Sequence, residues 1–520
     1  MTELVLPEEM TVPEAEAKLA SALSVMLSAP ESAEQTFYDT FDGRLHAAGV
    51  TLRHQDGRLA LLDVGAATDG AENAAVEIAA RPERLMASDL EPGPFRAALA
   101  KLAEVRALLP VAVLRTERSA ARVLDANAKT VVQIEFEQPS VIASAHRELA
   151  LRPRVRTVGL RGYDDELAAV EKVLVKRLGV RDPERPLVDE AVAAAGRPPA
   201  GVSARIEVPL LNQMRSDTAA VAVLARLLEV VEVNLPGTIA DIDAEYLHDL
   251  RVAVRRSRSV QRELQGVFPS SELPAWRAEF RWLQQVTGPA RDMDVYVLDF
   301  EEFRGRVPEA FQADLDPLLT VLRGRRLGAR RMMVRELRSD RAAAALAGWR
   351  AYLVSLEQLA LTDRPDATRP IASLAAERIR KLYRRMLRMG GAIDASSPAE
   401  AYHELRKKGK ELRYMLELFG APLFDPDVVT PMVKSLKSLQ DTLGRHQDRE
   451  VQIHTLRSLT GEVSALPGGE RALMAMGLLV ERLGRDERAA RDEFAGKFEV
   501  FSAKPRRRAV AQTFGPGAGS

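Results

Sequence analysis

The sequence contains no cysteine, which excludes disulfide bonds, thiolate zinc sites and cysteine nucleophiles. It also lacks a run of eighteen apolar residues, and acidic, proline-containing sequence follows Met1. We therefore expect neither a membrane span nor a secretory signal peptide. Because the lack of cysteine fits a reducing compartment, the expected location is the cytoplasm.

Several signatures of enzymes are missing as well. The motifs GxxxxGK[ST], HExxH and GxSxG do not occur, and the seven histidines are too scattered to suggest a metal site. We therefore expect no catalytic residue, no cofactor and no metal. Aromatic residues make up only 5% of the chain, which leaves few rings to stack on nucleic-acid bases and disfavours nucleic acid as the partner.

The net charge is zero, but it is unevenly distributed. Residues 1–200 hold 24 Lys and Arg against 31 Asp and Glu, a formal charge of −7, while residues 201–520 hold 50 against 43, or +7. Such an asymmetry often accompanies an anionic partner of the basic part. It is weak evidence by itself.

The pattern along the chain predicts an α+β protein of two domains. Alternating residues around Gln55-Asp56-Gly57 and around Asp125-Ala126-Asn127 predict hairpins of an antiparallel, barrel-like sheet within residues 1–180. We assign 181–208, rich in Pro, Gly and Ala, as a linker, 209–500 as an all-α domain, and 501–520 as a basic disordered tail. The predicted helices of the all-α domain are 213–233, 245–267, 272–303, 313–338, 341–361, 371–389, 398–419, 428–458 and 470–495.

The all-α part contains an internal repeat. The segment YLHDLRVAVRRSRSVQREL, from Tyr246, resembles AYHELRKKGKELRYMLEL, from Ala401. Further on, LQQVTGPARDMDV, from Leu283, resembles LQDTLGRHQDREV, from Leu439. The offsets are 155 and 156 residues, so two matched blocks occur in the same order. The domain is therefore predicted to hold two copies of one helical bundle.

Each copy carries a histidine followed by basic residues three, seven and ten positions later. At about 100° per residue these positions span about 80° of one helix face. Like charges stacked in this way repel one another, so a helix selected only for stability would alternate the signs. Because the stripe occurs twice, we interpret it as an anion-binding site. Its residues are His248, Arg251, Arg255 and Arg258 in the first copy and His403, Arg406, Lys410 and Arg413 in the second.

Two arginine-rich segments accompany the stripes. Arg326 and Arg330 share a helix face before the midpoint of the domain, and Lys381, Arg385 and Arg388 share another just before the second stripe. A solvated surface is the simpler interpretation of either segment alone. Their recurrence beside the stripes predicts one extended positive channel, which suits a long polyanion better than a single phosphate.

The stripes LHDLRVAVRRSRS and YHELRKKGKELRY, together with the LQxxxGxxxD blocks, resemble the CHAD domain, the conserved histidine α-helical domain, over about residues 211–500. The resemblance implies two pseudo-symmetric helical bundles around a basic central cavity that binds inorganic polyphosphate. By position, the eight stripe residues would line that cavity.

The N-terminal part resembles the CYTH domain, a triphosphate-tunnel barrel, through FYDTFDGRLHAAGVTLRHQDGRLAL and RTERSAARVLDANAKTVVQIEFE. This resemblance implies a secondary anion site at the tunnel positions Arg53, Arg115 and Arg118. Working members also need carboxylates, because Mg²⁺ is held by oxygen ligands. Here arginine stands at positions 154 and 156 of the last expected strand, in place of glutamate. The resemblance therefore implies a degenerate barrel kept for binding or docking.

Together these features predict a protein that binds inorganic polyphosphate electrostatically, without enzymatic activity, in the cytoplasm at polyphosphate granules. Two alternatives remain open at this point. One is a CYTH-type metal-dependent triphosphatase or polyphosphatase, and the other is a nucleic-acid-binding protein, since phosphate attracts basic helices whatever its sequence. We also expect a protein partner on the N-terminal domain.

Overall fold

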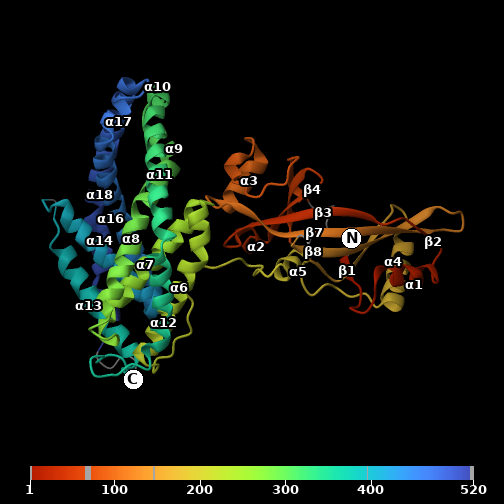
Figure 1. The fold of residues 1–520 in the computed structure, drawn as a ribbon, viewed down its shortest axis with the longest axis horizontal. Helices are drawn as coiled ribbons and strands as arrows, with labels where there is room; N and C mark the ends of the chain where they lie inside the picture. The colour runs from red at the N-terminus through yellow and green to blue at the C-terminus, as the bar shows by residue number, and fades with distance from the viewer. Residues whose placement is uncertain (1–2, 65–71, 145–146, 395, 516–520) are drawn as a thin grey trace. The chain divides into compact units, whose positions relative to one another are not determined.

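The computed structural model describes residues 3–64, 72–144, 147–394 and 396–515. The chain divides into two compact units, Met1–Ala204 and Arg205–Ser520. Figure 1 shows that strands dominate the first unit and helices the second. This arrangement confirms the predicted fold class, an antiparallel sheet domain followed by a helical domain.

The N-terminal unit is built on one ten-stranded antiparallel sheet. Its order is β1-β10-β8-β7-β3-β4-β5-β6, with β2 paired to β7 and β9 paired to β8. Within the described ranges, β1 and β6 at the two ends of this order do not pair with each other. The strands are β1 Glu3–Val5, β2 Val25–Leu27, β3 Glu31–Thr40, β4 Val50–Gln55, β5 Arg58–Asp63, β6 Glu72–Glu77, β7 Leu108–Leu124, β8 Thr130–Ser144, β9 Arg147–Ala150 and β10 Arg154–Gly159.

Both predicted hairpins are present. Asp56 and Gly57 have positive φ angles of 51° and 73°, which a two-residue turn between twisted strands requires, and they connect β4 to β5. The Asp125 side chain accepts hydrogen bonds from the backbone N of Asn127 and Lys129 at 2.8 and 2.9 Å. This closes the turn between β7 and β8, the two longest strands of the sheet.

Helices cover both faces of the sheet. On one face, α1 (Val12–Ala20) and α4 (Asp164–Val173) pack on a core that includes Ile134, Phe136 and Val155. On the other, α5 (Leu187–Ala194) packs on a smaller core that includes Leu114. Two further helices of this unit are α2 Arg44–Ala47 and α3 Pro94–Ala103, and a π-helical turn extends α4 over Leu174–Leu178.

The predicted linker 181–208 is therefore wrong over part of its length. Within it, α5 buries Leu187, Ala191 and Val192 against Phe37 and the sheet. These three positions lie on one helix face, so burying them stabilises the helix in spite of its flanking prolines. The N-terminal unit accordingly extends to Ala204.

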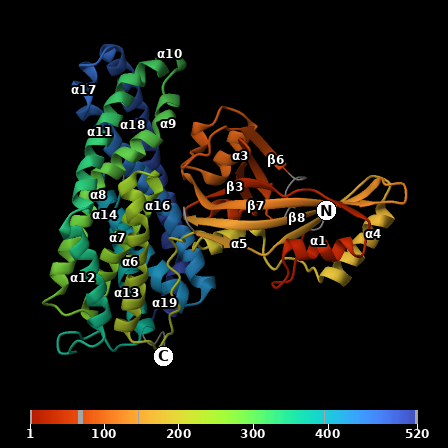
Figure 2. The same ribbon diagram turned by 45° about the vertical axis from the view of Figure 1, so that its right-hand side comes forward.

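The C-terminal unit consists of long helices, and the repeat is visible in their order. A shift of about 155 residues relates α6, α7 and α8 to α13, α14 and α16, and α11 to α18. Figure 2 shows α8, α11, α16 and α18 running together along the length of this unit. The long helices are α6 Ser216–Ala240, α7 Ala244–Glu263, α8 Leu273–Leu298, α11 Asp316–Leu337, α12 Asp340–Leu356, α13 Ile371–Gly391, α14 Ala399–Met415, α16 Pro426–Ser458 and α18 Gly469–Ser502. Shorter helices are α9 Phe300–Gly305, α10 Glu309–Gln312, α15 Ala421–Leu423, α17 Thr460–Ser464 and α19 Lys504–Thr513.

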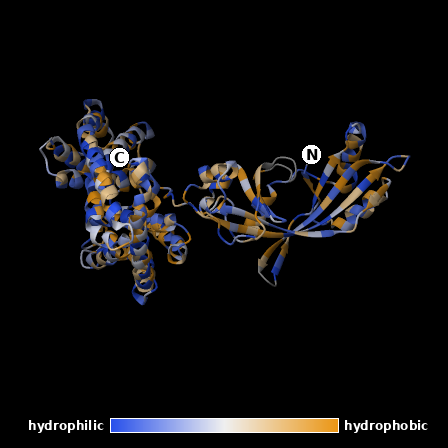
Figure 3. Ribbon diagram, turned by 90° about the horizontal axis from the view of Figure 1, so that it is seen from above, coloured by the Kyte–Doolittle hydropathy of each residue, from blue (hydrophilic) through white to orange (hydrophobic). Residues whose placement is uncertain are grey.

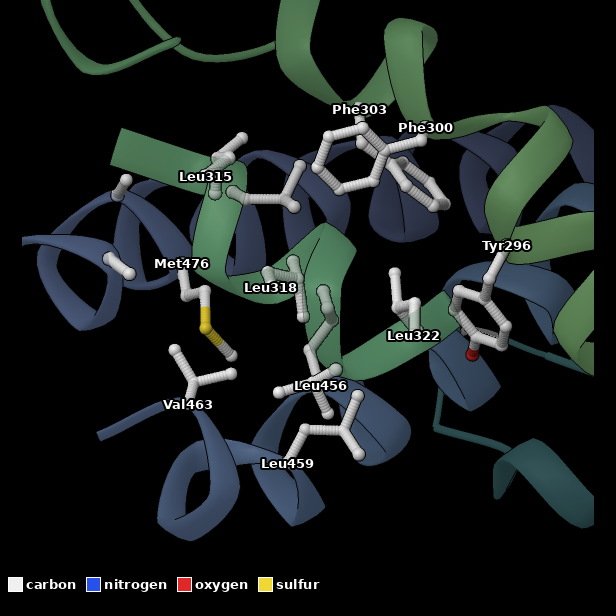
Figure 4. Packing of buried hydrophobic residues seen from close by; sticks show 14 of the residues in the cluster. Tyr296, Phe300, Phe303, Leu315, Leu318, Leu322, Leu456, Leu459, Val463 and Met476 are labelled. Carbon is white, nitrogen blue, oxygen red and sulfur yellow. The ribbon is translucent and has the colours of Figure 1, made fainter. Parts of the chain in front are cut away.

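A shared apolar core joins the two copies of the bundle. Phe300, Phe303 and Leu322, from α9 and α11, pack with Leu456 and Met476 from α16 and α18. Figure 4 shows these side chains facing one another between helices far apart in the sequence. Figure 3 shows apolar and polar residues interspersed along the helices of this unit. Because each copy buries part of its apolar surface in the other, the two form one folding unit.

The predicted disordered tail 501–520 is wrong over its first part. Phe501 and Phe514 are fully buried, and α19 buries Val510. The guanidinium of Arg507 donates to the carbonyl of Ser502 at 2.5 Å and so caps the end of α18. The last residues of that prediction, 516–520, lie outside the described residues. In the described part of the chain, no helix is long and apolar enough to span a membrane.

Candidate anion-binding site

The two basic stripes lie on helices whose opposite sides anchor them in the core. In α7, the Asp243 side chain accepts from the backbone N of Glu245 and Tyr246 at 2.9 and 3.2 Å, which caps the helix before the first stripe. Leu247 and Leu250 are buried on the inner side of α7, as Leu405 and Leu412 are in α14. We call the eight residues His248, Arg251, Arg255, Arg258, His403, Arg406, Lys410 and Arg413 the stripe cluster.

Two ion pairs connect α7 to the second copy, and they are equivalent under the repeat. Arg256 contacts Glu417 at 2.7 Å, and Arg262 contacts Glu411 at 3.1 Å. With the offset of 155, Arg256 corresponds to Glu411 and Arg262 to Glu417. The two bridges are therefore the same contact with its charges exchanged. They relate the two helices by a pseudo-two-fold axis and bring the stripes together.

Arg255 and Lys410 occupy equivalent positions of the two stripes. Burial lowers the pKa of Lys410 to about 8, and repulsion from Arg406 and Arg255 adds to this effect. Neither Arg255 nor Lys410 makes a hydrogen bond or an ion pair with a residue that the structure describes. Asp292 and Asp448 lie within electrostatic reach but do not neutralise the cluster. Two partly buried cations thus lie close together without a direct ion pair among the described residues, an arrangement that an anion would stabilise.

The arginines one turn earlier are held in place by the second repeated block. Arg251 donates to the Gln284 carbonyl and to the Thr287 hydroxyl, both at 2.9 Å, and burial lowers its pKa to about 10. Arg406 donates to Asp448 at 3.0 Å. A Cβ atom added at Gly288 would lie 3.6 Å from Arg251 Nη1, and one at Gly444 would lie 3.6 Å from Arg406 Nη2. The glycine of each LQxxxGxxxD block therefore leaves room for the guanidinium of its own copy.

The two histidines are oriented by residues that also correspond under the repeat. Arg291 Nη2 donates to Nδ1 of His248 at 3.0 Å, so this nitrogen carries no proton and Nε2 is the donor. In the second copy, Nδ1 of His403 donates to Gln447 Oε1 at 2.5 Å. Arg291 and Gln447 occupy equivalent positions, so the same place fixes opposite ring tautomers.

The outer ends of the stripes differ between the copies. Arg258 donates to the Gln284 side chain, and burial lowers its pKa. Its counterpart Arg413 instead lies 3.6 Å from Glu417. The buried side chain of Gln440, which corresponds to Gln284, has no hydrogen-bond partner among the described residues.

Comparisons with known proteins bear on this helical region. The family model described as the CHAD domain matches residues 222–457. This region is a CHAD domain. Two uncharacterized proteins of Mycobacterium tuberculosis, MT2285 from strain CDC 1551 / Oshkosh and Rv2226 from strain H37Rv, are each 33% identical over 218 residues, which is 39% of this chain. The match spans 38% of the length of either relative.

Two solved structures are also similar to this chain. The CHAD domain from the plant Ricinus communis has 24% sequence identity and a TM-score of 0.49, covering 56% of this chain and 96% of that one. PptA from Streptomyces chartreusis has 17% identity and a TM-score of 0.42, covering 55% and 100%.

Arg326 and Arg330, predicted to belong to the anion site, form ion pairs within the CHAD domain. Arg326 contacts Asp294 at 2.6 Å and Asp241 at 2.7 Å. Arg330 is buried, contacts Asp241 at 2.9 Å and donates to the Thr238 carbonyl at 2.8 Å. These bonds tie α11 to α8 and to the end of α6, so both arginines connect helices of the domain, and their part in the anion site stays a prediction. Helical spacing alone does not reveal the carboxylates that other helices supply.

Lys381, Arg385 and Arg388 lie on the outer side of α13. All three are exposed, whereas Met386 is buried and lies near Gly409 of α14. α13 therefore packs on α14 with its apolar side and turns these cations to solvent. They belong to the CHAD domain but form a surface of their own.

In the N-terminal unit, the strand register separates the three predicted tunnel arginines. Arg118 of β7 lies opposite Glu137 of β8 and Glu31 of β3. Phe37 is six residues from Glu31 on β3, so it lies on the same face, and Arg53 of β4 lies opposite Phe37. Arg53 and Arg118 are therefore on one face of the sheet. Arg115 is an odd number of residues from Arg118, so it lies on the other face, where it contacts Glu34 at 2.8 Å. The predicted site is wrong in including Arg115.

Ion pairs with glutamates dominate the face that carries Arg118. The buried Glu137 contacts Arg118 and Arg156, both at 3.0 Å. Arg154 contacts Glu3 at 2.6 Å and Glu190 at 3.3 Å. In the described ranges, no group of three or more His, Asp or Glu side chains is arranged to hold a metal ion. The arginines of β10 supply the positive charge that these glutamates need.

Proposed function

We propose that the CHAD domain binds inorganic polyphosphate, and that the stripe cluster is its principal site. The observation that carries the proposal is the pair Arg255 and Lys410, two partly buried cations from equivalent positions that make no hydrogen bond or ion pair with the described residues. Like charges held together in this way destabilise the fold, and an anion that shares them offsets this cost. A chain of phosphates offers several anionic oxygens in sequence and so can neutralise both stripes at once.

The chemistry of the donors also favours phosphate. Arginine forks bind phosphate oxygens bidentately, lysine acts as a point charge, and the Nε2 proton of His248 is a further donor. The stripe cluster contains no Phe, Tyr or Trp, and Tyr414, the ring that Arg413 lies over, is buried, which disfavours base stacking and favours polyphosphate over nucleic acid.

For the N-terminal unit we infer a degenerate CYTH-like barrel without triphosphatase activity. Supporting this, arginines occupy two positions of β10 where that family has glutamates, and they neutralise Glu3 and Glu137. A metal ion would have to displace these guanidinium groups. We propose that this unit docks a protein partner and that the whole chain associates with polyphosphate granules in the cytoplasm.

The decisive experiment is a titration of the full-length protein with long-chain polyphosphate at several salt concentrations. In Arg255→Gln/Lys410→Gln, we expect the magnitude of the slope of log affinity against log salt concentration to decrease by about 1.4, since each lost phosphate contact contributes about 0.7. The affinity itself should fall more than about tenfold. A matched control, Arg323→Gln/Arg331→Gln, removes two exposed charges from α11 and should change the affinity less than about twofold.

Two outcomes contradict the proposal. Equal losses in the site variant and the control would mean that binding follows net charge alone. Single-stranded DNA that displaces polyphosphate at equal phosphate concentration, and is itself lost in the site variant, would favour nucleic acid as the ligand.

A further inference from the structure

α13 presents a second cluster of cations, separate from the stripe cluster. Its inner side buries Ile379, Leu382 and Met386. Its outer side carries five basic residues, of which four are exposed and Arg380 is half-buried. We call Arg380, Lys381, Arg384, Arg385 and Arg388 the α13 surface.

These five cations lie on one side of α13 without an acidic partner among the described residues, whereas several other exposed arginines of the helical unit are paired. Among the described residues, none of them makes a salt bridge or a side-chain hydrogen bond. By contrast, Arg341 contacts Glu279 at 3.0 Å and Arg485 contacts Glu481 at 2.7 Å. The five charges therefore repel one another along two turns of helix without compensation.

A pocket of about 590 Å³ lies on this surface. Four of the five cations line it together with Leu387 and Glu377. Glu377 is already paired with Arg369 at 2.9 Å and with Arg378 at 3.7 Å, so it does not neutralise the pocket. The pocket is an open hollow between side chains of this one helix, and an anion there would meet several cations.

Only one copy of the repeat has this surface. The offset of 155 places Ala225, Arg226, Glu229, Val230 and Val233 of α6 at the five equivalent positions. The single basic residue among them, Arg226, is paired with Glu229 at 3.0 Å. Since α6 forms the same helix of the same bundle without these charges, the fold does not require them.

We propose that the α13 surface is a second binding surface for a polyphosphate chain, which long chains contact together with the stripe cluster and short chains do not. This inference rests on the proposed function and adds to it a selection for chain length. Arg380, Arg384 and Arg388 follow one another at intervals of four residues, or about 6 Å along the helix, so one extended chain meets them in turn. Simultaneous contact with two surfaces of one domain raises the affinity without any new contact at the stripe cluster.

The α13 surface favours a phosphate chain over a nucleic acid. Tyr383 is the sole aromatic residue in the sequence of α13, and it is buried, with 2% of its surface exposed. No ring on the helix is therefore available to stack on a base. Charge alone recognises the ligand here, as expected for a polymer with an anionic group on every unit.

The test compares the affinities of the full-length protein for tripolyphosphate and for long-chain polyphosphate. In Arg380→Gln/Arg384→Gln/Arg388→Gln, we expect the affinity for the long chain to fall at least about tenfold and its salt slope to fall by about 2. The affinity for tripolyphosphate should stay within about twofold, because the stripe cluster is intact. Glutamine is a good helix former, and the helical content by circular dichroism checks that α13 is retained.

The control Arg323→Gln/Arg331→Gln/Arg338→Gln removes the same charge from exposed arginines on and after α11 and should leave both affinities within about twofold. Equal losses for both triple variants, or an unchanged affinity for the long chain, would overturn the inference and leave the proposed function standing. If the wild-type protein binds neither chain, the proposed function itself fails. Loss of single-stranded DNA binding with unchanged polyphosphate binding would assign the α13 surface to nucleic acid instead.

Discussion

Replacing Lys410 with methionine should stabilise the CHAD domain and weaken its binding of polyphosphate. The ammonium group is buried, lies near Arg255 and Arg406, and has a pKa lowered from 10.5 to about 8. That difference corresponds to about 3 kcal/mol by which the charged side chain destabilises the folded domain at neutral pH. Methionine keeps the aliphatic bulk and removes the charge, so the free energy of unfolding should rise by up to about 3 kcal/mol.

The pH dependence gives an independent measure of the same quantity. Because the folded-state pKa of Lys410 lies below the unfolded value, the unfolded chain binds this proton more tightly between about pH 8 and pH 10.5. The contribution of Lys410 to stability therefore increases as the pH rises through this window. In Lys410→Met this contribution disappears, while the other titrating groups still contribute as before.

Urea unfolding of the full-length protein, followed by tryptophan fluorescence, measures both effects. Trp276, Trp282 and Trp349 are the three tryptophans of the chain, and all lie in the helical unit, so the signal reports this unit alone. Trp349 is fully buried, 5.2 Å from the Trp276 ring. The reasoning is refuted if Lys410→Met is less stable than the wild type at about pH 7, or if both show the same change between about pH 7 and pH 9.5.

Three further predictions follow from the ion pairs. Arg256→Glu should lower the free energy of unfolding, measured in urea, by about 1–2 kcal/mol, and the added change Glu417→Arg should restore most of this loss. If the two losses simply add, the ion pair is not formed. Arg251→Ala/Arg255→Ala should weaken polyphosphate binding more than about tenfold and lower the stability by about 1 kcal/mol, because Arg251 also ties α7 to α8. With Mg²⁺ and tripolyphosphate, phosphate release should stay near background, and a robust rate that Glu137→Ala abolishes would instead identify an enzyme.

The sequence predicts the stripe residues because they occur twice. A single run of cations on a helix is ambiguous, but the same spacing at an offset of 155 residues is a pattern that surface charge alone rarely produces. The repeat also contains a second indication, at positions outside the stripes. Arg256 and Arg262 correspond to Glu411 and Glu417, and opposite charges at equivalent positions indicate a contact between the copies.

Other features depend on neighbours that are distant in the sequence. Nothing in the spacing of Arg326 indicates that Asp241 and Asp294 surround it in the fold. Arg115 is a different case, since its three-residue separation from Arg118 already places the two on opposite faces of any strand. The helix in the predicted linker was hidden by its prolines, although Leu187 and Ala191 have helical spacing.

The exchanged ion pairs between α7 and the segment formed by α14 and the turn after it also determine which partners each copy of the bundle accepts. Two first copies placed in the same arrangement would bring Arg256 against Arg262, and two second copies would bring Glu411 against Glu417. Each copy thus repels a second copy of itself and attracts the other, which disfavours dimers formed through two identical copies from different chains. Because each copy has its own place in the contact, the rest of the two sequences can differ. The equivalent helices α6 and α13 differ in charge in this way, while the contact between the copies is kept.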